Sequence, residues 1–112
     1  MNGVRYDSLL GGTEQPTYIR NVKISSDTTV ERGTLLAGTF DGSDVKVHVA
    51  LASDATNGAE LFIATEEATG ASVIGAYESG VFNRSAIKTT GDVRAFEKEM
   101  RRQGLWLKEE LK

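Results

Sequence analysis

Among the residues of this sequence that could take part in chemistry, the first to consider is the single histidine. Histidine is the one side-chain type that changes charge near neutral pH without help from its surroundings, and His48 is the only example here. It alternates with Val47 and Val49 and shares a strand face with Lys46, which favours a solvated surface histidine. No Gly-x-Ser-x-Gly motif presents a serine nucleophile for it to activate.

Two carboxylate pairs have spacings that invite comparison with known sites. Asp41 and Asp44 flank Gly42, where loop carboxylates can hold a cation, but calcium-binding loops use more ligands at fixed spacing. Hairpin-turn chemistry explains this pair better. Glu66 and Glu67 are of the residue type that glycosidases use, yet neighbours on an extended chain face opposite ways. A solvated turn is the better interpretation.

The overall composition excludes several kinds of functional site. The 112 residues include no cysteine and one histidine, which excludes thiolate metal sites and multi-histidine centres within one chain. Residues 70–75 lack the Gly-Lys-Ser/Thr ending of a phosphate loop. A net charge of −3 disfavours nucleic acid as a partner, and no apolar run reaches the roughly 18 residues that cross a membrane. We therefore expect no enzymatic activity, no cofactor and no metal ion, and a protein as the partner.

Alternating apolar residues predict short β-strands through the middle of the chain. The first covers residues 21–25, with Val22 and Ile24 on one face. A later strand covers residues 45–51, and the side chains expected to share its apolar face are Val45, Val47, Val49 and Leu51. Short strands about ten residues apart, separated by turn dipeptides such as Asn57-Gly58, predict a small sandwich or barrel-like core.

The C-terminal part of the chain changes to a helical period. Asp92 is placed to cap a helix over residues 93–103, and Gly104 to end it in the left-handed conformation. Glu97 and Arg101 form an i,i+4 pair on this helix. The predicted fold class is α+β and mostly β, a single domain with a short C-terminal helix.

Trp106 is the only tryptophan and alternates with Leu105 and Leu107 on a short final strand. If the two leucines face the core, Trp106 faces outward. It then lies either in a contact between molecules or against the domain's own helix. Because tryptophan is frequent at interface hot spots, Trp106 is a candidate subunit-interface residue.

Residues 1–20 follow neither a helical nor a strand period and are interpreted as an extended N-terminal arm, with residues 21–112 as the domain. The arm is either a frayed terminus or a segment that orders on a partner. Its start lacks the pattern of a secretion signal, so synthesis in the cytoplasm is the default expectation. The arm residues expected to contact a partner are Tyr6, Leu9, Leu10, Pro16, Tyr18 and Ile19.

Three stretches carry a family pattern when they are taken in order. Val30–Ala37 places Arg-Gly before an apolar pair, Tyr77–Ile87 contains Ser-Gly-Val-Phe-Asn, and Phe96–Lys108 ends a helix in Gly-Leu-Trp-Leu-Lys. Together with Val49–Thr56, they resemble the head decoration proteins of tailed bacteriophages, the capsid-cementing family typified by phage lambda's protein D. The resemblance covers about residues 30–108. It departs from the family where Gly-Ile-Leu is replaced by Val-Ala-Leu at residues 49–51, and in a short arm with one proline.

The resemblance implies a non-enzymatic structural protein on the exterior of the virion capsid. Such proteins bind the expanded mature head, commonly as trimers at three-fold positions, and strengthen the shell against the pressure of internal DNA. Their arm typically extends a sheet of the major capsid protein, a mode that needs an extended backbone with apolar anchors. The expected partners are therefore the major capsid protein and further copies of this chain.

Other functions remain open at this point. One is another virion component, such as a tail or head-completion protein. A second is a small β-rich module that recognises a sugar or a peptide. An enzyme would need a pocket that joins carboxylates distant in sequence.

Overall fold

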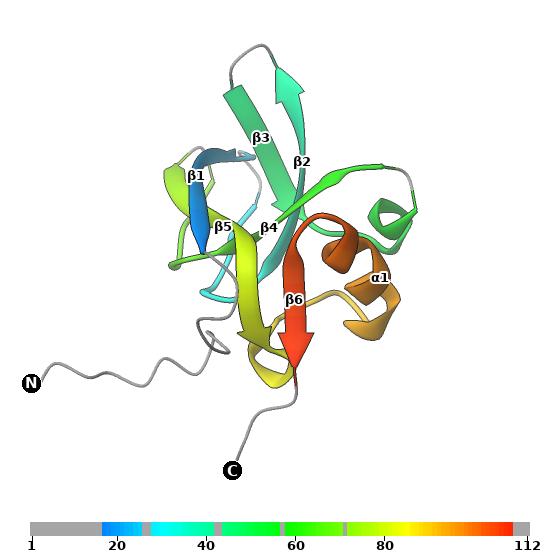
Figure 1. Ribbon diagram of the computed structural model, residues 1–112. Helices are drawn as coiled ribbons and strands as arrows, with labels where there is room; N and C mark the ends of the chain where they lie inside the picture. Colours follow the sequence, from blue (N-terminus) through cyan, green and yellow to red (C-terminus); the bar gives the residue numbers. More distant parts are fainter. Residues whose placement is uncertain (1–16, 26–27, 42–43, 57, 71, 109–112) are drawn as a thin grey trace, which may run out of the picture.

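The computed structural model describes residues 17–25, 28–41, 44–56, 58–70 and 72–108 (Figure 1). This part of the chain is mostly β, with one short α-helix, as predicted. Among the described residues, no helix has the length and apolar character needed to cross a membrane. The elements in chain order are β1 (Tyr18–Ile24), β2 (Leu35–Asp41), β3 (Asp44–Val49), the 3₁₀ turn η1 (Ala52–Ala55), β4 (Glu60–Ala64), β5 (Val73–Asn83), the 3₁₀ turn η2 (Arg84–Ala86), α1 (Arg94–Arg102) and β6 (Leu105–Lys108).

Five of the strands close into a barrel, one of the two architectures, sandwich or barrel-like core, that the sequence predicted. The strands follow the order β1-β3-β2-β4-β5, and pairing between β1 and β5 closes the ring. Neighbouring strands are antiparallel except β1 and β3, which pair in parallel at Lys23 and Ile24. The hairpin expected around Gly42 joins β2 to β3, with Asp41 opposite Asp44; the two turn residues lie outside the described residues.

The barrel has two apolar cores, one inside it and one against its outer wall. The inner cluster comprises Val22, Ile24, Val30, Leu36, Val45, Val47, Phe62, Ala64, Ile74 and Ala76. The outer cluster comprises Leu35, Ala37, Ala50, Leu61, Ile63, Tyr77, Phe82, Ile87, Phe96, Met100 and Leu105. Because successive side chains of a strand point to opposite faces, β2 and β4 supply both clusters. Burial on both faces explains why their sequences are continuous apolar runs.

The last part of β5 leaves the barrel and pairs with β6. Residues 80–83 run parallel to β6, whereas the earlier part of β5 pairs with β1 and β4. The change occurs at Gly80, whose φ of +143° is one that other residues rarely adopt. Strand β6 and helix α1 then cover one side of the barrel, while β1 lies on another side (Figure 1).

The C-terminal helix agrees with its prediction at both ends to within one residue. The backbone N of Arg94 donates to Asp92 Oδ1 at 2.9 Å, and Gly104 follows the helix with a φ of +93°. Phe96 and Met100 are buried on the inner face.

The prediction for the third strand was wrong at its end. Strand β3 ends at Val49, and Leu51 is 52% exposed rather than part of the apolar face. The reason is a hydrogen bond to Asp54, which lies five residues after the end of β3. Asp54 accepts from the backbone N of Leu51 at 2.8 Å and so turns the chain into η1.

Candidate functional site

The predicted arm residues divide into two groups in the structure. Tyr6, Leu9, Leu10 and Pro16 lie outside the described residues. Tyr18 and Ile19 begin β1 and pair with β5, so the end of the segment interpreted as the arm is part of the barrel wall. Both side chains are large, apolar and exposed, Tyr18 by 59% and Ile19 by 57%.

The point where the arm joins the barrel is built around small residues of β5. The backbone N of Tyr18 donates to Ser79 Oγ at 3.3 Å, and the register of β1 against β5 shifts between Tyr18 and Ile19. A Cβ atom on Gly80 would lie 3.1 Å from Thr17 Oγ1 and 3.0 Å from Phe82 Cζ. The Ser-Gly pair of the family-like stretch therefore lets the chain cross closely over β5 here.

An ion pair links the same two strands. Arg20 Nε lies 2.8 Å from Glu78 Oε2 and joins β1 to β5 across the barrel wall. The hydrogen bond to Glu78, together with the charge of Glu78 and of Glu60, raises the pKa of Arg20 above its ordinary value. Arg20 is thus a permanent cation beside residues 17–19, where the arm joins the barrel. We call these residues the arm root.

Trp106 faces outward, in agreement with the predicted alternation. It lies on β6 opposite Val81 and is 41% exposed, whereas its neighbour Leu105 is fully buried in the outer core. Within the described part of the chain, β6 pairs only with β5, so its far edge carries no strand. A role for Trp106 in a subunit contact stays a prediction.

The arm root and Trp106 are connected through consecutive residues of β5. Ser79 lies opposite Tyr18, and Val81 lies opposite Trp106. Figure 1 shows β1 and β6 flanking β5 at this point. Two surfaces predicted separately, from the N-terminal and the C-terminal ends of the chain, are therefore held by one three-residue segment of β5.

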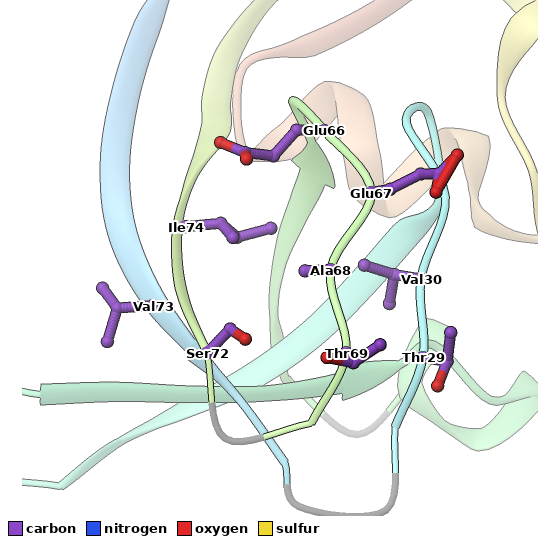
Figure 2. A pocket seen from close by; sticks show the side chains of 9 residues that line it. All are labelled: Thr29, Val30, Glu66, Glu67, Ala68, Thr69, Ser72, Val73 and Ile74. Carbon is purple, nitrogen blue, oxygen red and sulfur yellow. The ribbon is translucent and has the colours of Figure 1, made fainter.

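A shallow cavity of about 410 Å³ opens at a different place, beside the start of β5. Figure 2 shows Val30, Ala68 and Ile74 forming its apolar part, with the carboxylates of Glu66 and Glu67 extending in different directions. The remaining lining residues are Thr29, Thr69, Ser72 and Val73. The two carboxylates thus do not converge on one point as a glycosidase pair would.

Sequence reasoning did not anticipate this cavity, because it depends on a contact between distant segments. The backbone N of Val30 donates to the Ala68 carbonyl at 2.9 Å, and the N of Ala68 returns a hydrogen bond at 3.1 Å. A single bridge of this kind leaves no period in the sequence.

The residues that first suggested chemistry have structural partners. His48 Nε2 lies 3.0 Å from Oδ2 of Asp54, the buried carboxylate that also begins η1. The His48 side chain lies at the surface, as predicted, and is 42% exposed, but the sequence did not indicate its contact with Asp54 of η1. In the described residues, no group of three or more His, Cys, Asp or Glu side chains is arranged to hold a metal ion.

Comparisons with known proteins give no independent assignment. No family model matches the chain, and no curated protein matches it in sequence.

Proposed function

We propose that this chain is a capsid decoration protein of a tailed bacteriophage, which binds the expanded mature head, most simply as a trimer, and stabilises it without enzymatic activity. The observation that carries the proposal is that the resembling stretches form one packed unit. Leu35, Phe82 and Phe96, one from each of the three stretches, share the outer core, and Gly80 pairs in register with Leu105. The motifs that resemble the family are thus the residues that build one side of the domain.

The arm root supports the same proposal. The side chains of Tyr18 and Ile19 are exposed where β1 begins, so the described part of the chain starts at the surface of the barrel. An extended arm with apolar anchors is suited to adding a strand to a partner's sheet.

Shell stabilisation then follows from binding alone. A protein that binds only the expanded shell stabilises that state by its differential affinity. A closed trimer engages several shell subunits at once, and linked contacts of modest strength combine into tight binding.

The test is co-sedimentation of the purified protein with undecorated shells, in expanded and unexpanded forms. Saturable binding to the expanded form is expected. Deleting residues 1–16 should abolish that binding while leaving the thermal midpoint unchanged. The deletion stops there because Tyr18–Lys23 pairs with β5, and a longer truncation would open the barrel.

Two outcomes would contradict the proposal. A folded protein that binds neither shell form is no decoration protein, and a tail or head-completion component would become the better assignment. Full binding by the truncated protein would show that the arm is not the attachment point.

A further inference from the structure

Helix α1 carries four basic and two acidic residues, although the chain as a whole has a net charge of −3. Phe96 and Met100 are buried and define the side of the helix that packs against the barrel. Successive residues of an α-helix lie about 100° apart around its axis. The side opposite Phe96 and Met100 therefore presents Arg94, Lys98 and Arg101, which are all exposed. We call these three residues the basic crest.

The two acidic residues of the helix lie on its flanks, between the crest and the buried side. On one flank, Arg84 holds both carboxylate oxygens of Glu97. On the other flank, Glu99 Oε2 accepts from Gln103 Nε2 at 2.9 Å, and Glu99 Oε1 lies 3.3 Å from Arg102 Nε. The side chains of Glu97 and Glu99 are only 21% and 16% exposed. Both carboxylates are thus engaged away from the outward side of the helix.

The basic crest carries positive charge in excess of the carboxylates around it. Within the described residues, none of its three cations has an ion-pair partner. Arg94 and Arg101 help to lower the pKa of Glu97, but that carboxylate already neutralises Arg84.

The neighbouring segments contribute too few carboxylates to offset this excess. Asp92 precedes the helix, and its Oδ1 accepts from the backbone N of Arg94, so it caps the first turn. Asp54 of η1, which packs against α1, is buried and faces His48. When η2, the cap and α1 are counted together, five basic side chains accompany three carboxylates. Two positive charges are left over on this part of the described structure.

Arg94 is not explained by the stability of the helix. It is the first residue of α1, where the free backbone N–H groups leave a partial positive charge that favours acidic side chains. A cation at this position is unfavourable for the helix itself, whereas Arg101 in the last turn is favourable. An anionic group of another molecule would offset the unfavourable position of Arg94.

We infer that the basic crest of α1 docks onto an acidic protein surface. This inference rests on the proposed function, because it takes the acidic surface to be that of the expanded capsid shell. Three cations along about two turns of one helix match a row of carboxylates, and the attraction grows as water is excluded between them. The helix presents them rigidly, since Gln103 bonds to the backbone of Leu61 and Ala59. Because α1 and β1 lie on different sides of the barrel, this contact is separate from the arm root and adds to it (Figure 1).

A protein surface fits the basic crest better than a nucleic acid or a membrane does. Nucleic-acid binding relies on many phosphate contacts, and the chain as a whole carries a net charge of −3. A helix that binds a membrane surface buries its apolar side among the lipids. The apolar side of α1, with Phe96 and Met100, is already buried against the barrel.

The experiment compares wild type with Lys98→Glu in shell co-sedimentation and in thermal unfolding. The new carboxylate stands four residues after Arg94 and four before Arg102, so the thermal midpoint should stay equal or rise. The affinity for expanded shells should fall about tenfold or more, because a carboxylate would then face the acidic surface. The wild-type affinity should also fall more steeply with added salt than that of the variant. The matched control is Lys23→Glu, the same charge change at an exposed position of β1.

The outcomes separate this inference from the proposed function. If wild type binds expanded shells and Lys98→Glu binds them as well as Lys23→Glu does, the docking surface is overturned and the decoration proposal stands. If wild type binds no shells, both fail.

Two further measurements test the other occupants of the basic crest. If Lys98→Glu weakens self-association of the free protein in sedimentation velocity, the crest contacts another copy and the inference is overturned. If a duplex DNA oligonucleotide binds wild type and binds Lys98→Glu more weakly, the crest is a nucleic-acid surface and the inference is overturned as well.

Discussion

Arg84 holds Glu97 through two parallel hydrogen bonds, with Nε 2.9 Å from Oε1 and Nη2 2.8 Å from Oε2. The pair joins η2 to α1, and each side chain is only about one-fifth exposed. The hydrogen bond from Arg84 is the main reason that the pKa of Glu97 lies below its ordinary value of 4.5, and it outweighs the opposing effect of burial. Bidentate pairs of this type are among the stronger polar contacts in proteins.

This pair predicts an acid-sensitive contribution to stability. A carboxyl whose pKa is lower in the folded than in the unfolded state stabilises the fold above the unfolded pKa and loses that contribution as pH falls through the folded pKa. Glu97→Gln should therefore lower the free energy of unfolding by about 1 kcal/mol at pH 7. The difference from wild type should shrink below about pH 4.5. Urea unfolding at a series of pH values measures it.

The control for this prediction is Glu66→Gln, at an exposed carboxylate in the turn before β5. Its free energy of unfolding should stay within about 0.5 kcal/mol of wild type across the series. A difference between Glu97→Gln and wild type that is constant with pH would show that Arg84 does not act through the charge of Glu97.

A second prediction concerns stability and rests on Gln103, which lies at the junction between α1 and β4. Its Oε1 accepts from the backbone N of Leu61 at 2.8 Å, and its Nε2 donates to the Ala59 carbonyl at 3.0 Å. Gln103→Ala leaves the buried Leu61 N–H without this partner, so the free energy of unfolding should fall by about 1–3 kcal/mol. Lys98→Ala, at an exposed position of the same helix, should change it by less than about 0.5 kcal/mol. Equal effects of the two variants in chemical denaturation would refute a bridging role for Gln103.

The sequence predicted the helix well because the signals that bound it are local. Asp92 caps the first turn and Gly104 follows the last one, and both act within a few residues of the helix. The hydrogen-bond partner of Glu97, by contrast, could not be predicted from the local sequence. Arg101 stands at the favourable helical spacing, but the observed hydrogen bonds come from Arg84, which only tertiary packing brings into reach.

The strands show the same division between local and distant signals. Alternation identified the inward residues of β1 and β3, such as Val22 and Val47, since side-chain direction follows from the strand period alone. Closure of the barrel could not be predicted, because among the described residues the parallel pairing of β1 with β3 spans only Lys23 and Ile24. The outward direction of Trp106 was predictable for the same local reason.

A third prediction, also of stability, rests on Gly38 in the barrel wall. A Cβ at this position would lie 2.7 Å from the Lys46 carbonyl oxygen and 2.7 Å from Val47 Cγ1. One of these contacts is with backbone, which cannot move without disturbing the pairing of β2 with β3. Gly38→Ala should therefore lower the free energy of unfolding by about 1–3 kcal/mol, and Gly38→Val by more.

The comparison for Gly38 is its neighbour Thr39, whose side chain is exposed on the same strand. Thr39→Ala should cost less than about 1 kcal/mol, since it only lowers strand propensity. If thermal or urea unfolding gives Gly38→Ala and Thr39→Ala the same small cost, the close approach of β3 to Gly38 is not a constraint on the fold.

Trp106 carries the last prediction, which separates folding from assembly. Trp106→Ser removes an outward side chain on β6, which is an edge strand in the described structure, so the domain should still fold, with an unfolding cost of about 1–2 kcal/mol. If Trp106 lies in a contact between copies, its loss should weaken self-association or shell occupancy by at least about 2 kcal/mol, roughly thirtyfold in affinity.

Leu51→Ser is the matched control, because Leu51 is also apolar and 52% exposed but lies beside η1. Sedimentation velocity measures self-association and co-sedimentation measures shell occupancy. Indistinguishable behaviour of the two variants in both assays would mean that Trp106 is an ordinary surface residue.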